Sequence, residues 1–181
     1  MNARHDPRGT TLLAIARAAI ATRASEGRGD WSEPWLREPG ASFVTLKLED
    51  ELRGCIGTLQ PHRALGDDVA HNAFASAYRD PRFPPVDDRE MPRLQVEVSL
   101  LSPREAMAVG SEAEALAALR PGVDGVVIQY GGLGSTFLPQ VWESLPEPRE
   151  FLRHLRHKAG LPADFWHADM KVWRYTVEKF A

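Results

Sequence analysis

Strand patterns that stand in adjacent pairs are the feature that most constrains the fold of this chain. Residues 43–48, FVTLKL, alternate apolar and polar side chains, and a short EDE turn leads into LRGCIGTL at 52–59. This pattern predicts a β-hairpin. A second hairpin is predicted from GVVIQY at 125–130, a GGLGS turn and TFLPQVW at 136–142. Hairpin strands are antiparallel, so a regular βαβ alternation around a parallel sheet is disfavoured.

Two further strands are predicted outside the hairpins. LQVEVSLL at 94–101 is the cleanest strand pattern, and KVWRYTVEKF at 171–180 forms the last one. The alternation in LQVEVSLL predicts that one face of this strand packs against the core and the other is open. Its inward side chains would be Leu94, Val96, Val98 and Leu100, and its outward ones Gln95, Glu97 and Ser99.

Four segments have the apolar spacing of amphipathic helices. The first is followed by Gly27, and the second ends at Asp80 because the residue before a proline avoids helical dihedrals. The third opens with a capping box formed by Ser111 and Glu114. The four predicted helices span residues 10–23, 62–80, 111–122 and 148–160.

The order of these elements favours an α+β fold, with a mainly antiparallel sheet flanked by helices. At 181 residues the chain is too short for two ordinary domains, so we expect a single domain over 1–181 that can be divided into two lobes. With 43% hydrophobic residues, 26% charged residues and a net charge of -3, the composition is typical of soluble globular proteins.

Composition also excludes classes of function. No basic stripe is present, which disfavours binding to nucleic acids, because the phosphates need a clustered positive surface. The apolar run TTLLAIARAAIAT contains Arg17 and is too short to span a membrane. It lacks the cleavage pattern of a signal peptide, so we expect a cytoplasmic protein that does not bind membranes.

The chain has one cysteine, Cys55, in the motif LRGCIGT. One thiol cannot form an internal disulfide, an iron–sulfur cluster or a thiolate zinc site, and we expect no metal and no cofactor. Arg53 stands two residues away on a predicted strand, and a guanidinium beside a thiol favours the nucleophilic thiolate. Gly54 and Gly57 leave room for a ligand or for another segment of the chain.

The opposite interpretation of Cys55 also fits the residues. Free cysteines are among the most buried side chains, and a small one between glycines can fill a tight corner. A phosphate-binding Walker loop is excluded, because Thr58 and Leu59 follow the second glycine where Lys and Ser or Thr are required.

Five motifs occur in an order that resembles the AMMECR family, whose bacterial and archaeal members are called protein A of the AmmeMemoRadiSam system. They are LRGCIGT, DPRFPP, EVSLL, FLPQV, and KAGL followed shortly by a tryptophan. The resemblance covers nearly the whole chain. It implies an α+β fold with a larger and a smaller lobe and a cleft near the LRGCIGT motif. It also implies two partners, a Memo-type protein and a radical S-adenosylmethionine protein, but no reaction.

The motifs, taken together with the chemistry of Cys55, define the candidate site. We expect three catalytic residues: Cys55 as nucleophile, Arg53 as the group that favours its thiolate, and Glu97 as the group that moves a proton. The expected substrate-binding residues are Gly54, Gly57, Thr58, Asp80, Arg82, Phe83, Gln140 and Lys158.

Several of these residues have a structural alternative that the sequence leaves open. Glu97 can equally be a surface glutamate in an ion pair, and Arg82 can bind Asp80 instead of an anionic ligand. Asp67, Asp68 and His71 share one side of a helix, which is the spacing of a metal face but more often that of a polar helix surface.

Two functions follow from these alternatives. One is a small enzyme that acts through Cys55 on a small molecule or a modified side chain. The other is a non-catalytic module that binds a ligand or docks the Memo-type and radical partners, since no complete catalytic triad is present.

Overall fold

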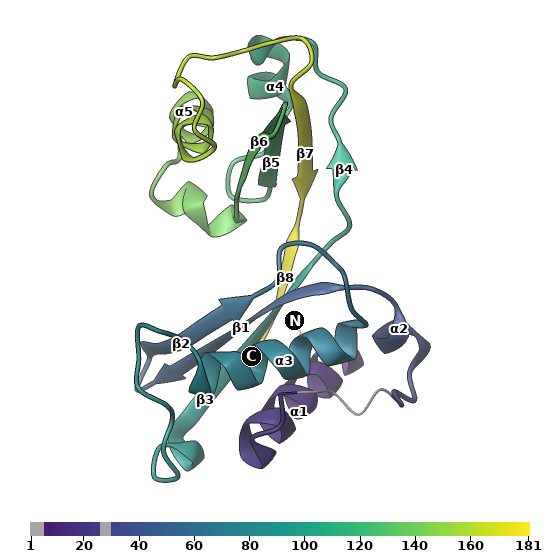
Figure 1. Ribbon diagram of the computed structural model, residues 1–181, viewed down its shortest axis with the longest axis vertical. Coiled ribbons are helices and arrows are strands. Elements are labelled where there is room, and N and C mark those ends of the chain that lie inside the picture. Colours follow the sequence, from purple (N-terminus) through teal and green to yellow (C-terminus); the bar gives the residue numbers. More distant parts are fainter. Residues whose placement is uncertain (1–5, 26–29) are drawn as a thin grey trace, which may run out of the picture. The chain divides into compact units, whose positions relative to one another are not determined.

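The computed structural model describes residues 6–25 and 30–181. It confirms the α+β class, with two four-stranded antiparallel sheets flanked by helices (Figure 1). The chain divides into two compact units. The first unit comprises the chain up to Leu101 together with Glu178–Ala181, and the second comprises Ser102–Val177. In the described part of the chain, no helix is long and apolar enough to cross a membrane.

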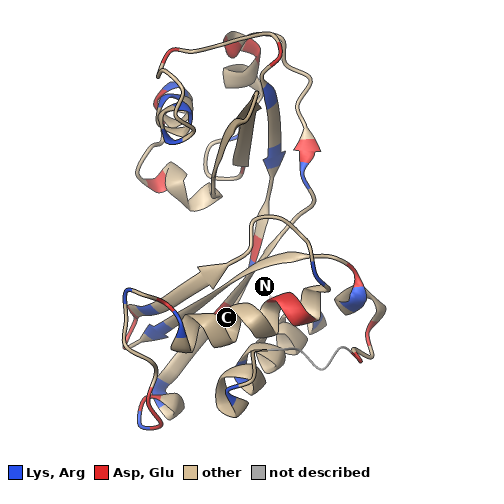
Figure 2. Ribbon diagram, viewed as in Figure 1, with Lys and Arg blue, Asp and Glu red and all other residues tan. Residues whose placement is uncertain are grey.

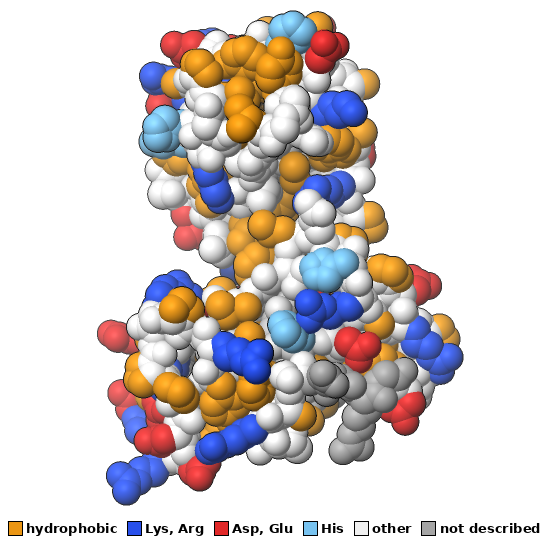
Figure 3. All heavy atoms as spheres, in the orientation of Figure 1, with side chains coloured by type: hydrophobic (Ala, Val, Ile, Leu, Met, Phe, Trp, Pro, Cys, Tyr) orange, Lys and Arg blue, Asp and Glu red, His pale blue; other side chains and the backbone are white. Residues whose placement is uncertain are grey.

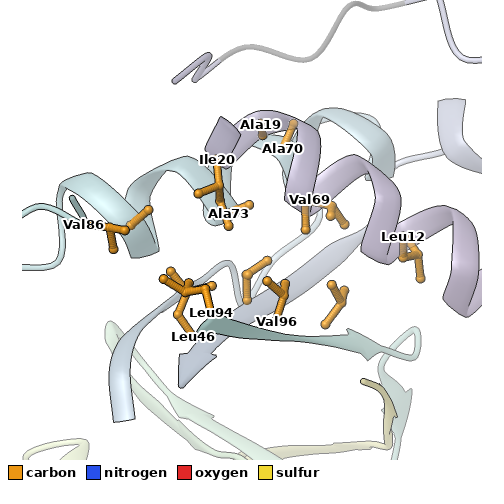
Figure 4. Close-up of a cluster of buried hydrophobic side chains, with 14 of the residues drawn as sticks. Leu12, Ala19, Ile20, Leu46, Val69, Ala70, Ala73, Val86, Leu94 and Val96 are labelled. Carbon is orange, nitrogen blue, oxygen red and sulfur yellow. The ribbon is translucent and has the colours of Figure 1, made fainter. Parts of the chain in front are cut away.

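The first unit is built on a sheet with the strand order β2-β1-β3-β8. Its core lies between this sheet and helices α1 and α3, as Figure 4 shows with Leu12, Val69, Leu46 and Val96. The elements of this unit are α1 (Pro7–Thr22), α2 (Pro34–Arg37), β1 (Ala41–Leu48), β2 (Glu51–Gly57), α3 (Leu65–Tyr78), the 3-10 helix η1 (Met91–Arg93), β3 (Leu94–Leu101) and β8 (Val177–Phe180).

The predicted alternation decides which face of this sheet is packed. Val44 and Leu46 of β1 and Val96 and Val98 of β3 are all buried against the helices. The residues between them therefore point to the other side of the sheet, which we call the helix-free face. The loop tryptophans Trp31 and Trp35 pack against the same core.

Helix α1 begins three residues earlier than predicted. Asp6 caps it by accepting a hydrogen bond from the Arg8 backbone N–H, and Pro7 stands in the first turn, where its missing N–H costs nothing. The helix ends at Thr22, and the residue that caps it, Arg23, has a positive φ of 54°. Gly27, the predicted end signal, lies outside the described residues.

The second unit contains the other sheet, with the strand order β4-β7-β5-β6. Trp142 and Phe151 stack in its core with ring centroids 3.8 Å apart. Half of the predicted capping box is present: Ser111 accepts a hydrogen bond from the Glu114 N–H, but the Glu114 carboxylate accepts from the Gly110 N–H and not from that of Ser111. The elements are β4 (Glu105–Ala106), α4 (Glu112–Ala118), β5 (Gly125–Tyr130), β6 (Leu133–Phe137), the 3-10 helix η2 (Pro139–Glu143), α5 (Pro148–Lys158) and β7 (Lys171–Tyr175).

Two predicted strands were wrong in extent. The turn of the second hairpin is only Gly131-Gly132, so β6 starts at Leu133 and ends before Pro139, which cannot donate to a ladder. The last predicted strand is two strands, β7 and β8, which belong to different sheets. The break falls at Thr176, whose N–H and C=O are both bonded to Ser102.

The two motif glycines are explained by packing within the first unit. A Cβ atom on Gly54 would lie 2.2 Å from the backbone oxygen of Ser76 in α3. A Cβ atom on Gly57 would lie 2.1 Å from the ring of Phe43. The space beside both glycines is therefore filled by the chain itself.

We predict that Gly54→Ala lowers the free energy of unfolding by about 2–3 kcal/mol, because a helix backbone must move to admit the methyl group. Urea denaturation followed by circular dichroism measures the loss. The control is Gly132→Ala, where nothing lies within 4 Å of the added Cβ. Equal stability of the two variants would contradict the close packing of α3 on β2.

Candidate functional site

Cys55, Thr45 and Glu97 form a row across three strands on the helix-free face. Thr45 is paired with Cys55 of β2 on one side and with Glu97 of β3 on the other. Directly opposed residues of antiparallel strands place their side chains on the same face. The Thr45 hydroxyl lies 3.4 Å from the Cys55 sulfur, and the thiol is partly exposed.

Thr45 was not among the predicted site residues, although the sequence carries a signal for it. In FVTLKL it stands between the inward-facing Val44 and Leu46, so alternation alone turns it to the face that holds Glu97. The strand spacing of ~4.8 Å separates the backbones of Cys55 and Glu97 by about 10 Å, with Thr45 midway. A small ligand that reaches both groups would lie over Thr45.

Glu97 is an ion-pair partner of two lysines. Its carboxylate oxygens lie 3.5 Å from the Lys47 ammonium and 3.8 Å from the Lys179 ammonium, and 20% of its side chain is exposed. The ion pair that the sequence left open as the structural alternative for Glu97 is therefore present. Both distances are longer than a strong charge-assisted hydrogen bond, so neither lysine holds the carboxylate tightly.

Arg53 contacts Glu90 and not the Cys55 thiol. Its Nε donates to Glu90 Oε1 at 2.7 Å and its Nη2 to Oε2 at 3.0 Å. This pair raises the pKa of Arg53 and lowers the pKa of Glu90. The physical reason is an irregularity in the β1–β2 ladder: Leu46 pairs with Gly54 and Lys47 with Leu52, which leaves Arg53 unpaired in a bulge.

Asp80 and Arg82 bind the backbone of Cys55. The Cys55 N–H donates to Asp80 Oδ2 at 2.9 Å, and Arg82 Nη2 donates to the Cys55 carbonyl at 3.0 Å. Strand β2 is at the edge of its sheet, so these side chains satisfy backbone groups that no neighbouring strand pairs. We call this arrangement the Asp80–Arg82 clamp.

The two clamp residues also bind each other. Arg82 Nε donates to Asp80 Oδ1 at 3.0 Å, and Nη2 donates to Oδ2 at 2.7 Å. Arg82 therefore holds the pKa of the buried Asp80 carboxyl well below its usual range, and the Cys55 N–H lowers it further. Phe83 lies between two guanidiniums, with its ring centroid 5.5 Å from Arg82 Cζ and 6.0 Å from Arg53 Cζ.

Thr58 belongs to a buried polar network at the end of β2. Its hydroxyl accepts a hydrogen bond from Asn72, which also donates to Asp68, and Asp68 binds the hydroxyl of Ser42. Asp68 is fully buried in this network. Within the described residues, no group of three or more His, Cys, Asp or Glu side chains could hold a metal ion.

Gln140 and Lys158 lie in the second unit, unlike the other predicted site residues. Gln140 is exposed in η2. The Lys158 ammonium donates to the Thr136 carbonyl at 3.0 Å and lies over the ring of Phe137. Among the predicted site residues, the structure brings Cys55, Asp80 and Arg82 into direct contact.

Comparisons with known proteins agree with this fold. Residues 13–180 match the AMMECR1 family. The chain is 37% identical to a protein of Methanothermobacter thermautotrophicus over 95% of this chain and 93% of the other. It is 41% identical to protein MJ0810 of Methanocaldococcus jannaschii over 95% and 89%. The crystal structure of the uncharacterized protein PH0010 from Pyrococcus horikoshii aligns with a TM-score of 0.77 at 36% identity, covering 94% of this chain and 89% of the other.

We predict that Asp80 makes folding sensitive to acid. Its folded-state pKa is depressed, so its stabilising contribution is complete well above the unfolded value of about 3.9 and is lost as pH falls through and below that value. Between pH 5 and pH 3 the wild type should lose about 1 kcal/mol more unfolding free energy than Asp80→Asn does. Urea denaturation at both pH values measures this difference.

The exposed Asp88, which pairs with Arg23, supplies the control variant Asp88→Asn. It should follow the wild type through the same pH range. An Asp80→Asn protein as acid-sensitive as the wild type would show that the clamp does not stabilise the fold.

Proposed function

The chain belongs to the AMMECR1 family, and we propose that it is a small cysteine-dependent enzyme that acts through Cys55 on a small molecule or a modified side chain. The observation that carries this proposal is the row of Cys55, Thr45 and Glu97 on the helix-free face. It combines a nucleophile, a hydroxyl and a carboxylate on one rigid sheet.

Each group has a chemical role in this proposal. The Cys55 sulfur, reactive as the thiolate, forms a bond to an electrophilic carbon of the substrate, and the bond from that carbon to a leaving group breaks, with the electron pair departing on the leaving group. Glu97 accepts or returns a proton at the far end of the row, about 10 Å away, so the substrate must extend across Thr45. The Asp80–Arg82 clamp fixes the backbone from which the thiol projects. A cytoplasmic location suits this chemistry, because a free thiol stays reduced there.

The first test is the rate at which iodoacetamide alkylates Cys55 in the folded protein. Because the chain has one cysteine, intact mass measures the reaction directly. We expect the folded rate at pH 8 to lie within about tenfold of the rate in urea, since the thiol is partly exposed. We also expect Glu97→Gln to change how the rate depends on pH.

The matched control is Glu178→Gln, because Glu178 lies on β8 and pairs with Arg8. This variant should keep the wild-type pH profile. A thiol that reacts only after unfolding would overturn the proposal and identify Cys55 as a buried packing residue.

A second candidate function is docking of partner proteins. Two arginine–aromatic pairs lie close together in the chain. The Arg79 guanidinium carbon lies 4.9 Å from the ring centroid of Phe74, and the Arg82 guanidinium lies over the ring of Phe83. Arginine and aromatic side chains dominate the energetic centres of protein interfaces. Figure 3 shows Lys and Arg side chains beside hydrophobic ones on the face in view, and Figure 2 shows basic and acidic positions distributed over both units. The partners in this proposal are the Memo-type and radical S-adenosylmethionine proteins.

We expect Arg79→Ala to weaken binding to these partners by about tenfold or more in an affinity measurement with purified proteins, if docking is the function. Arg79 is the better probe than Arg82, because it takes no part in the Cys55 clamp. Arg89→Ala, another exposed arginine of the same unit, is the control. No association of the wild type with either partner would exclude this candidate.

A further inference from the structure

The guanidinium of Arg82 is held in one orientation beside Cys55. Three of its N–H groups are engaged: Nε and one Nη2 hydrogen point to Asp80, and the other Nη2 hydrogen points to the Cys55 carbonyl. The Asp80 carboxylate is a rigid anchor, because only 1% of its side chain is exposed. It also accepts the backbone N–H of Arg82 at 3.1 Å, which fixes the start of the side chain.

One end of this guanidinium has no partner. A guanidinium has five N–H donors, and in the contacts among the described residues the two donors on Nη1 are not used. The Arg82 side chain is 53% exposed. Arg53, the arginine expected beside the thiol, has only 11% of its side chain exposed; Glu90 binds its Nε and Nη2, and its unpartnered Nη1 is buried. Arg82 is therefore the cation at Cys55 that can still bind a ligand.

The charges around Arg82 determine what it can bind. Asp80 and Arg82 together carry no net charge, as do the adjoining Arg53 and Glu90, so long-range attraction of an anion is weak. At short range the Asp80–Arg82 pair has a positive end. Asp80 lies on the Nε–Nη2 edge of the guanidinium, and Nη1 faces away from the carboxylate. The hydrogen bond to Asp80 raises the pKa of Arg82, so the guanidinium stays positively charged.

We propose that the Cys55 site takes an anionic substrate, whose carboxylate or phosphate group binds the Nη1 amino group of Arg82 next to the thiol. This inference rests on the proposed function and names its substrate class. Two N–H donors on a fixed cation form charge-assisted hydrogen bonds with an oxyanion, which are about twice as strong as neutral ones. Arg82 Nη2 binds the Cys55 carbonyl at 3.0 Å, so an anion held at Nη1 of the same guanidinium lies at the residue that carries the thiol.

The test compares iodoacetate with iodoacetamide on the full-length protein. In both reactions the sulfur forms a bond to the CH₂ carbon and iodide leaves, and the reagents differ in the charge of one small group. The measured quantity is the ratio of the iodoacetate rate to the iodoacetamide rate. We expect this ratio to be about threefold or more higher in the folded wild type than in the same protein unfolded in urea.

Variants assign the effect to Arg82. Arg82→Gln should bring the ratio down to its unfolded value, Arg82→Lys should retain part of it, and Arg79→Gln should leave it unchanged. A wild-type ratio equal in the folded and unfolded states would overturn the inference. Because this comparison uses the wild type alone, it decides the matter even if Arg82→Gln does not fold.

A titration with inorganic phosphate separates this inference from the proposed function. The Cys55 amide is bonded to Asp80 in the clamp, so its nitrogen and proton NMR signals should shift as phosphate binds Arg82. A saturable shift in wild type that is lost in Arg82→Gln supports the anion site even if iodoacetamide fails to react with the folded protein. No shift at Cys55, together with no preference for iodoacetate, refutes the anion site even where iodoacetamide reacts readily.

Discussion

The close approach of helix α3 to strand β2 is the constraint on which the rest of the site depends. It is possible because Gly54 has no side chain, so the carbonyl of Ser76 can occupy that space. At the same crossing the Ser76 hydroxyl donates to the Val44 carbonyl and accepts the Ile56 N–H. These contacts fix the direction of α3, and its end brings Asp80 to the edge of β2 beside Cys55. A wider spacing between helix and strand would leave the Cys55 backbone unpaired.

Most of the LRGCIGT motif serves this geometry. Gly54 and Gly57 make room for parts of the chain, Thr58 joins a buried network, and Arg53 binds Glu90. Only Cys55 presents a reactive atom from this motif to the helix-free face. The motif therefore positions one thiol, and the charged groups near that thiol come from other parts of the first unit.

The sequence predicted the elements well and the contacts of the charged residues less well. Alternation along β1 and β3 identified the packed face, because one buried side of a sheet imposes a strict period of two. The same rule failed for Arg53, because a bulge adds a residue to the strand and changes which groups the Arg53 side chain contacts. Glu90, 37 residues away, carried no signal that would have marked it as the partner. The division of residues 171–180 between two sheets was also invisible, since both strands share one continuous pattern.

The course of the last strands has a consequence for the order in which the protein can form during synthesis. Strand β8 lies next to β3 in the sheet of the first unit, although the whole second unit is translated between them. Lys179 on this strand is also one of the two lysines beside Glu97. During translation the β3 edge of the first sheet therefore stays unpaired until residues 177–180 have emerged from the ribosome. An interrupted translation product would lack both the closing strand and part of the charge around Glu97.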